Sequence, residues 1–290
     1  MFLEQSNDRR LPADYSGNVL VFDIDKTYLD TSFSSFRGLI AIPLEFAVDK
    51  SALPGAVHLI RALRHGPGAD SALTPLYFVS GSPVQMRSVI QQKMTLDGVQ
   101  YDGITFKDQW GLLRAGRPRD IKAQVGYKLQ ALLLYRRELP DAVRYLLFGD
   151  DVEEDSESFH LFGEICAGLR DEPLAERLRA HRVAKADVEQ IVRIASTLPI
   201  TADPVDRVFI ILTKNEPSRF ADHPRVVAAR SYLQTALVLA EMGKIQSEAI
   251  SAVARDLRRN RISEQTIAEH LTDAETRFGV RRETTLLARQ

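Results

Sequence analysis

Four short apolar runs constrain the fold of this chain more than any other feature. They are rich in β-branched and aromatic residues, which is typical of strands buried on both faces of a sheet. The runs cover residues 18–24, 75–79, 143–148 and 206–212. Segments with helical spacing of apolar residues alternate with them, at about 54–65, 84–95, 120–137 and 155–170. This alternation predicts an α/β fold of three layers, with helices on both faces of a mainly parallel, Rossmann-like sheet.

The second half of the chain departs from this alternation. Apolar residues at helical spacing dominate 171–199 and 217–280, with a turn-rich stretch and the last apolar run between them. We therefore expect three parts, which are an α/β core (1–170 and 200–216), a helical insertion (171–199) and a helical C-terminal region (217–290). The length of 290 residues allows the C-terminal region to be a subdomain packed on the sheet or a separate small domain.

Helix-capping residues mark possible boundaries in the C-terminal region. Ser263 is a plausible N-cap, and Thr272 with Glu275 fits the spacing of a capping box. Gly279 could end the last helix, because glycine readily adopts the left-handed conformation found there.

Charge and composition exclude several classes of protein. The chain has 38 Lys+Arg against 39 Asp+Glu, and neither half has the basic excess that dominates nucleic-acid binding. Acidic and polar residues interrupt the N-terminal segment, and no apolar stretch is long enough for a membrane span. The only cysteine, Cys166, cannot form an internal disulfide, and the six histidines lack the spacing of zinc ligands. These features predict a cytoplasmic protein without a transmembrane segment.

Polar side chains follow three of the four predicted strands. Asp23 and Asp25 follow the first, Ser80 the second and Asp150 the third. Ligands bind at the carboxyl ends of parallel strands, so these side chains are expected to share one crevice. Three carboxylates there would repel one another unless a cation lies among them, and oxygen ligands at an open site suit Mg²⁺. Such a site can transfer a phosphoryl group to an aspartate, while a second carboxyl group moves the proton.

As a set, these segments resemble the four motifs of haloacid dehalogenase superfamily phosphatases. The segments are VLVFDIDKTYLD, YFVSGSP, a downstream lysine and YLLFGDDVEED. Within the superfamily, the chain is most similar to the catalytic domain of the fungal actin-patch phosphatidate phosphatases and their bacterial relatives. That likeness covers about residues 17–162 and also includes LPGAVHLIRAL, YDGITFKD and YKLQALLLYRRELPD.

The resemblance implies catalytic roles at matching positions. Asp23 would be the nucleophile and a metal ligand. Asp25 would be the general acid and base, with its backbone carbonyl at the metal. Lys128 would stabilise the nucleophile and the phosphoryl group, and Lys122 is the alternative for that role. Asp150 would complete the Mg²⁺ site.

Further roles follow from the same resemblance. Ser80, Gly81 and Thr27 would bind the substrate phosphate, and Asp151 and Asp155 would hold metal-bound waters or Lys128. In another register, Asp25-Lys26-Thr27 resembles the phosphorylated motif of cation-transport ATPases, which would make Asp25 the nucleophile. The apolar run ends directly before Asp23, however, and no membrane spans are predicted, so we favour Asp23.

The expected function is therefore Mg²⁺-dependent hydrolysis of a phosphomonoester through an aspartyl-phosphate. The resemblance implies phosphatidate, a lipid at a membrane surface, as substrate. The alternatives are a phosphatase of a soluble phosphometabolite or phosphoprotein, and a non-catalytic scaffold of the same fold. Apolar residues within 33–44 could form a lip for a lipid or a packed loop. The cations between Lys107 and Lys122 could bind an anionic surface or simply be solvated.

Overall fold

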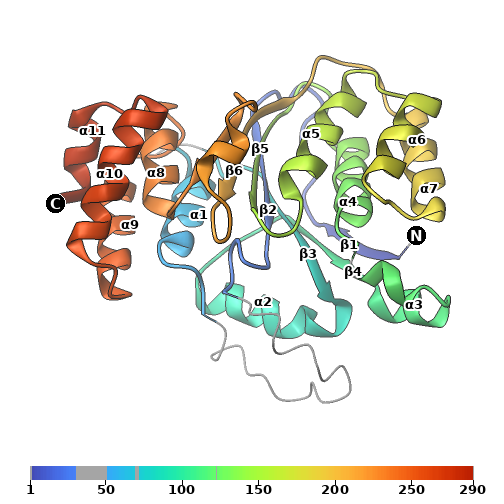
Figure 1. Ribbon diagram of the computed structural model, residues 1–290, viewed down its shortest axis with the longest axis horizontal. Helices are drawn as coiled ribbons and strands as arrows, with labels where there is room; N and C mark the ends of the chain where they lie inside the picture. The colour runs from blue at the N-terminus through green and yellow to red at the C-terminus, as the bar shows by residue number, and fades with distance from the viewer. Residues whose placement is uncertain (1, 31–50, 69–71, 122, 290) are drawn as a thin grey trace.

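The computed structural model describes residues 2–30, 51–68, 72–121 and 123–289. A seven-stranded sheet runs through the molecule in the order β1-β4-β3-β2-β5-β6-β7 (Figure 1). The strands are β1 (Leu3–Asn7), β2 (Asn18–Asp23), β3 (Leu76–Pro83), β4 (Gly103–Lys107), β5 (Arg144–Asp150), β6 (Val205–Ile211) and β7 (Val226–Ala229). Every neighbouring pair is parallel except β1 with β4. The predicted α/β class with a mainly parallel sheet is confirmed.

Helices cover both faces of the sheet (Figure 1). One face carries α1 (Ala56–His65), α2 (Arg87–Leu96), α8 (Tyr232–Glu241), α9 (Glu248–Arg259), α10 (Glu264–Phe278) and α11 (Arg282–Leu286). The other carries α4 (Val125–Glu138), α5 (Asp155–Cys166), α6 (Asp171–Ala180) and α7 (Lys185–Thr197). The short α3 (Gln109–Arg114) follows β4. Among the described residues, no helix has the length and apolar character needed to cross a membrane.

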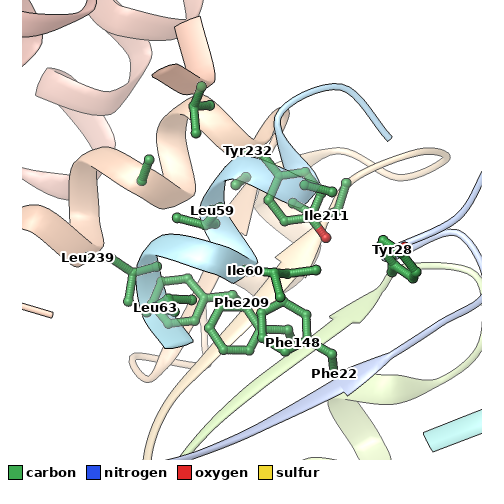
Figure 2. Packing of buried hydrophobic residues seen from close by; sticks show 14 of the residues in the cluster. Phe22, Tyr28, Leu59, Ile60, Leu63, Phe148, Phe209, Ile211, Tyr232 and Leu239 are labelled. Atoms are coloured by element: carbon green, nitrogen blue, oxygen red, sulfur yellow. The ribbon is translucent and has the colours of Figure 1, made fainter. Parts of the chain in front are cut away.

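The central strands bury side chains on both faces. Phe22 of β2 belongs to the core under α1 and α8, while Val21 belongs to the opposite core under α4 and α5. In the first core, the Phe22 and Phe148 rings stack with centroids 3.9 Å apart, and Phe209 continues the stack at 4.9 Å from Phe148 (Figure 2). Burial on both faces explains why these strands are continuous apolar runs in the sequence.

The region 217–290 is not wholly helical. Val226–Ala229 form β7, which pairs with β6 in parallel and extends the sheet by one strand. Only four residues long, this strand lacks the length that made the other apolar runs recognisable. Leu233 and Leu237 of α8 share a core with Phe22, so the C-terminal helices pack against the sheet. In contrast, residues 171–199 form α6 and α7, as expected, and α7 packs against α4.

The sequence pattern does not predict two other strands. The strand β1 reads Leu-Glu-Gln-Ser-Asn and lies at the sheet edge, where polar side chains remain accessible. The strand β4 has five buried residues but includes Gly103 and Lys107, which interrupt its apolar character. The sequence pattern predicts no element at either position, because short strands without an apolar run give little periodic signal.

The helix caps agree with the sequence in two of three cases. The Ser263 side chain accepts a hydrogen bond from the backbone N–H of Thr266 at the start of α10, and Gly279 ends this helix with φ 66°. The predicted capping box at Thr272 is wrong, because Thr272 lies inside α10 and donates its hydroxyl hydrogen to the carbonyl of Ala268. A capping box needs unpaired backbone N–H groups, which exist only in the first turn of a helix.

Candidate active site

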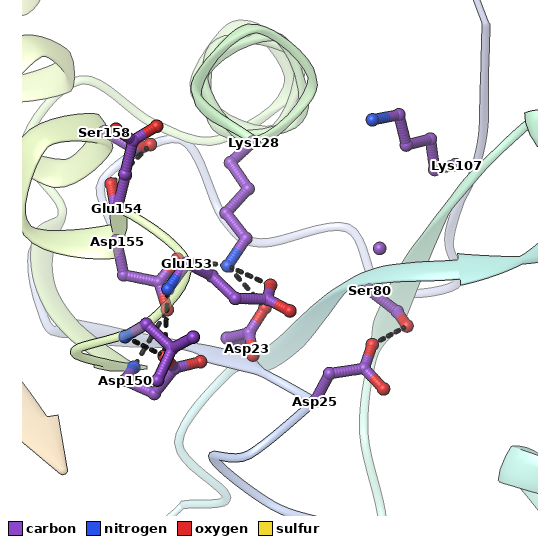
Figure 3. A network of polar contacts seen from close by, with 12 residues as sticks. Asp23, Asp25, Ser80, Lys107, Lys128, Asp150, Glu153, Glu154, Asp155 and Ser158 are labelled. Carbon is purple, nitrogen blue, oxygen red and sulfur yellow. Dashed lines mark hydrogen bonds and ion pairs between the residues drawn. The ribbon is translucent and has the colours of Figure 1, made fainter. Parts of the chain in front are cut away.

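The carboxyl ends of β2, β3 and β5 bring most of the predicted site residues together (Figure 3). Asp23 is the last residue of β2, and Asp25 follows two positions later. Ser80 lies in the second half of β3, and Asp150 is the last residue of β5. All four are at most 5% exposed. The strand β2 is central, and the chain continues from it to β3 on one side and later to β5 on the other. This reversal of strand order is where open α/β sheets bind ligands.

Lys128 reaches this site from the first turn of α4. Its Nζ lies 2.8 Å from Asp23 Oδ1 and 3.0 Å from Glu153 Oε2, and it also contacts Asp155. The side chain is 2% exposed, so these carboxylates surround a buried ammonium group. Lys122, the alternative for this role, lies outside the described residues.

Three buried carboxylates form a group that could hold a metal ion. Oxygens of Asp23, Asp150 and Glu153 lie within 4.8 Å of one another. Asp23 Oδ2 and Asp150 Oδ2 are buried and accept no hydrogen bond. Buried polar atoms are nearly always satisfied, so these oxygens indicate a missing partner. Carboxylate oxygens are the ligands that Mg²⁺ prefers, so this donor set fits the predicted ion.

The charges around Lys128 are unbalanced. Burial raises the pKa of Asp23 well above its usual range, Lys128 opposes this change, and the neighbouring carboxylates reinforce it. For the same reasons the pKa of Asp150 rises to about 6 and that of Asp155 to about 7. Burial alone would lower the pKa of Lys128, but Asp155 and Asp23 raise it, so its ammonium stays charged. Four carboxylates around one ammonium favour a further cation in the group.

The acidic residues that follow β5 make different contacts. Asp155 Oδ2 accepts a hydrogen bond from the backbone N–H of Asp150 (2.9 Å), and its other oxygen contacts Lys128. A Cβ at Gly149 would lie 2.3 Å from Asp155 Oδ2, so only glycine permits this approach. The carboxylate of Asp151 instead accepts hydrogen bonds from the backbone at 213–215. It therefore ties down the loop after β6 and is not in the group around Lys128.

Two serines in the second half of β3 face Asp25. Ser80 Oγ donates to Asp25 Oδ2 (3.1 Å), and Ser82 Oγ lies 3.1 Å and 3.0 Å from the two Asp25 oxygens. Gly81 lies between them and has no side chain. Its carbonyl accepts a hydrogen bond from the side chain of Gln109. Ser80 and Gly81 thus lie beside Asp25, and their binding of the substrate phosphate stays a prediction.

Thr27 lies in the segment that follows Asp23, and its buried hydroxyl oxygen has no hydrogen-bond partner among the described residues. Its side chain is fully buried, and its carbonyl accepts a hydrogen bond from the Tyr232 hydroxyl of α8. The loop that follows Asp23 is therefore attached to the C-terminal helices. Tyr232 lies more than 200 residues from Thr27 in the chain, and no spacing in the sequence predicts this contact.

Two site residues were missed in the sequence. The sequence motifs assign no role to Glu153, because its place in the metal-binding group depends on the turn at 150–153. There, Asp150 Oδ1 accepts hydrogen bonds from the backbone N–H groups of Val152 and Glu153. Ser82 was part of a recognised segment without a role. Its spacing of two residues from Ser80 is the signal that could have found it, because such residues share a strand face.

Of the described cations between 107 and 121, Lys107 and Arg117 are engaged within the protein. Lys107 is 3% exposed, and its Nζ donates to the carbonyls of Ile121 and Ala123. Arg117 forms ion pairs with Asp120 and Asp187. The apolar segment 33–44 lies outside the described residues.

Comparisons with known proteins do not identify a family. No family model, curated protein or solved structure matches this chain. The likeness to haloacid dehalogenase superfamily phosphatases therefore stays a prediction based on sequence motifs.

Proposed function

We propose that this protein is a Mg²⁺-dependent phosphomonoester hydrolase with Asp23 as its nucleophile. The observation that carries the proposal is the buried convergence of Asp23, Asp150 and Glu153 beside the ammonium of Lys128. Mg²⁺ bound to these carboxylates would supply positive charge against the phosphoryl oxygens. Acidic residues that merely face solvent would be neither buried nor paired with a buried lysine. Burying these carboxylates lowers stability, and a non-catalytic scaffold would gain nothing in return.

The proposed reaction proceeds in two displacements. An Asp23 oxygen forms a bond to phosphorus while the ester P–O bond breaks, and Asp25 donates a proton to the leaving alkoxide oxygen. The Asp25 carboxylate then accepts a proton from water, whose oxygen attacks the same phosphorus. The bond from phosphorus to Asp23 breaks, and inorganic phosphate leaves with Asp23 regenerated. Lys128 and Ser80 would stabilise charge on the phosphoryl oxygens.

The substrate class within this proposal is a phosphomonoester, and the motif resemblance supports phosphatidate. Soluble phosphometabolites and phosphoproteins use the same chemistry at phosphorus. Hydrolysis of phosphatidate in detergent micelles, compared with soluble phosphate esters and phosphopeptides, separates these substrates. We place the enzyme in the cytoplasm as part of the same proposal, on the sequence features that predicted it.

The test is hydrolysis of p-nitrophenyl phosphate by the purified protein with Mg²⁺. Asp23→Asn should lower kcat by about a thousandfold or more, because it removes the nucleophile. Asp14→Asn, which removes an exposed carboxylate elsewhere, is the control and should leave kcat unchanged. An aspartyl-phosphate trapped by acid quenching should be present in the unaltered protein and absent from Asp23→Asn. Equal kcat values for Asp23→Asn and the unaltered protein would refute the proposal.

A further inference from the structure

Ser82 contacts both oxygens of the Asp25 carboxyl group. Its Oγ lies 3.1 Å from Oδ1 and 3.0 Å from Oδ2, and the serine is 5% exposed. Ser80 contacts only Oδ2, at 3.1 Å. The backbone N–H of Ser82 also donates to Ser80 Oγ, at 3.1 Å. The two serines therefore form one hydrogen-bonded unit with Asp25 (Figure 3 shows the Ser80 contact).

The strand geometry explains why both serines face Asp25 and the residue between them does not. Successive residues of an extended strand point to opposite faces, so Ser80 and Ser82, which are two positions apart, share one face of β3. Gly81 turns to the other face, where an added Cβ would lie 2.9 Å from the hydroxyl oxygen of Tyr127 in α4. Tyr127 thus lies against Gly81 on that face, while both serine hydroxyl groups contact Asp25 on the other.

The two hydroxyl groups cannot serve the same purpose during the proposed reaction. Each serine hydroxyl has one hydrogen to donate. If Ser80 binds a phosphoryl oxygen, its hydrogen leaves Asp25, and Ser82 is then the serine that still donates to this carboxyl group. Because Ser82 Oγ lies at nearly equal distances from the two oxygens, it can hold the carboxyl group whichever oxygen carries the proton.

We propose that Ser82 is the positioning residue of the proton donor Asp25, and that it thereby determines how well the enzyme cleaves esters with strongly basic leaving groups. This inference rests on the proposed phosphatase function. An alkoxide leaving group requires protonation as the P–O bond breaks, whereas p-nitrophenolate leaves readily without it. A misplaced Asp25 should therefore slow the hydrolysis of alkyl phosphates more than that of aryl phosphates.

The experiment compares kcat/KM for glycerol phosphate and for p-nitrophenyl phosphate, because this quantity reports the step in which the leaving group departs. In Ser82→Ala the ratio of alkyl to aryl kcat/KM should fall by about tenfold, the effect of losing one hydrogen bond of roughly 1.4 kcal/mol. Asp25→Asn should lower the ratio further. Adding Ser82→Ala to Asp25→Asn should lower it no more, because no proton donor remains to be positioned. Thermal unfolding identifies any variant that does not fold.

The kcat/KM values distinguish failure of the Ser82 inference from failure of the phosphatase proposal. An equal fall in both kcat/KM values would show a general structural role for Ser82 and overturn the inference. So would an unchanged ratio, or a further tenfold fall in the double variant. If the unaltered protein with Mg²⁺ hydrolyses neither ester, the phosphatase proposal itself fails, and the role of Ser82 fails with it.

Discussion

Two regions of the molecule bury different kinds of side chain. The end of the sheet around Asp23 buries charged groups, whereas the C-terminal helices bury mainly apolar ones. Around Lys128, four carboxylates are at most 3% exposed, and at least two of their oxygens lack a hydrogen-bond partner. In α8 and α9, the buried side chains are mainly apolar, and Arg258 pairs with Glu264 at the surface. Buried charge without full compensation costs stability, whereas apolar burial supplies it. The chain thus maintains a costly site on a sheet that the apolar region helps to stabilise.

The largest expected loss of stability comes from Lys128→Met. Removing one partner of a buried ionic group leaves carboxylates without compensation, which should lower the free energy of unfolding by about 4 kcal/mol. Urea unfolding in EDTA measures this loss. Lys185→Met is the control, because the Lys185 side chain is 91% exposed and its substitution should change stability by less than about 0.5 kcal/mol. Equal stability of the two variants would contradict the view that Lys128 balances the site.

In the apolar region, Leu237→Ala should cost about 3 kcal/mol, because a fully buried leucine leaves a cavity when it is truncated. The loss should be the same with Mg²⁺ and with EDTA, since no contact of this leucine belongs to the acidic group. The control is Leu286→Ala, whose side chain is 46% exposed. A loss that depended on Mg²⁺ would mean that the two regions are not energetically distinct.

Mg²⁺ should stabilise the folded protein through Asp150. Mg²⁺ at about 30 times its dissociation constant should stabilise the unaltered protein by about 2 kcal/mol, through binding to the folded state alone. Asp150→Asn should lose most of this gain, while its stability in EDTA stays equal or rises because one buried carboxylate is gone. Thermal unfolding with and without Mg²⁺ measures both quantities. A full Mg²⁺-dependent gain in Asp150→Asn would place the ion elsewhere.

The smallest expected effect lies at the contact between the two regions. Tyr232→Phe removes the hydroxyl that donates to the Thr27 carbonyl and should cost about 1 kcal/mol of unfolding free energy. Tyr77→Phe is the matched control, because the buried Tyr77 hydroxyl has no hydrogen-bond partner. If both variants lose equal stability, the contact between Tyr232 and Thr27 contributes nothing specific.

The sequence predicted the central part of the fold because β2, β3, β5 and β6 are continuous apolar runs. The same rule located Asp23, Ser80 and Asp150, since each follows such a run. The preference for Lys128 over Lys122 rested instead on the motif resemblance, and Lys128 lies in α4, the helix that precedes β5.

Other features depended on information that local patterns lack. The strands β1, β4 and β7 are short or polar, so only their pairing partners define them. The placement of Glu153 required the turn that Asp150 forms with its own backbone, and the tie between Tyr232 and Thr27 joins distant parts of the chain.

The antiparallel strand β1 has a consequence for aggregation. It covers the edge of β4, where Ile104 and Phe106 are fully buried and their backbone groups would otherwise be open to pairing. Exposed edges of this kind recruit strands from other chains. The partners of β1 lie about 100 residues further along, so β1 is made long before β4 and must wait for it during synthesis. The polar residues of β1 keep that early segment unattractive to other chains until its partner exists.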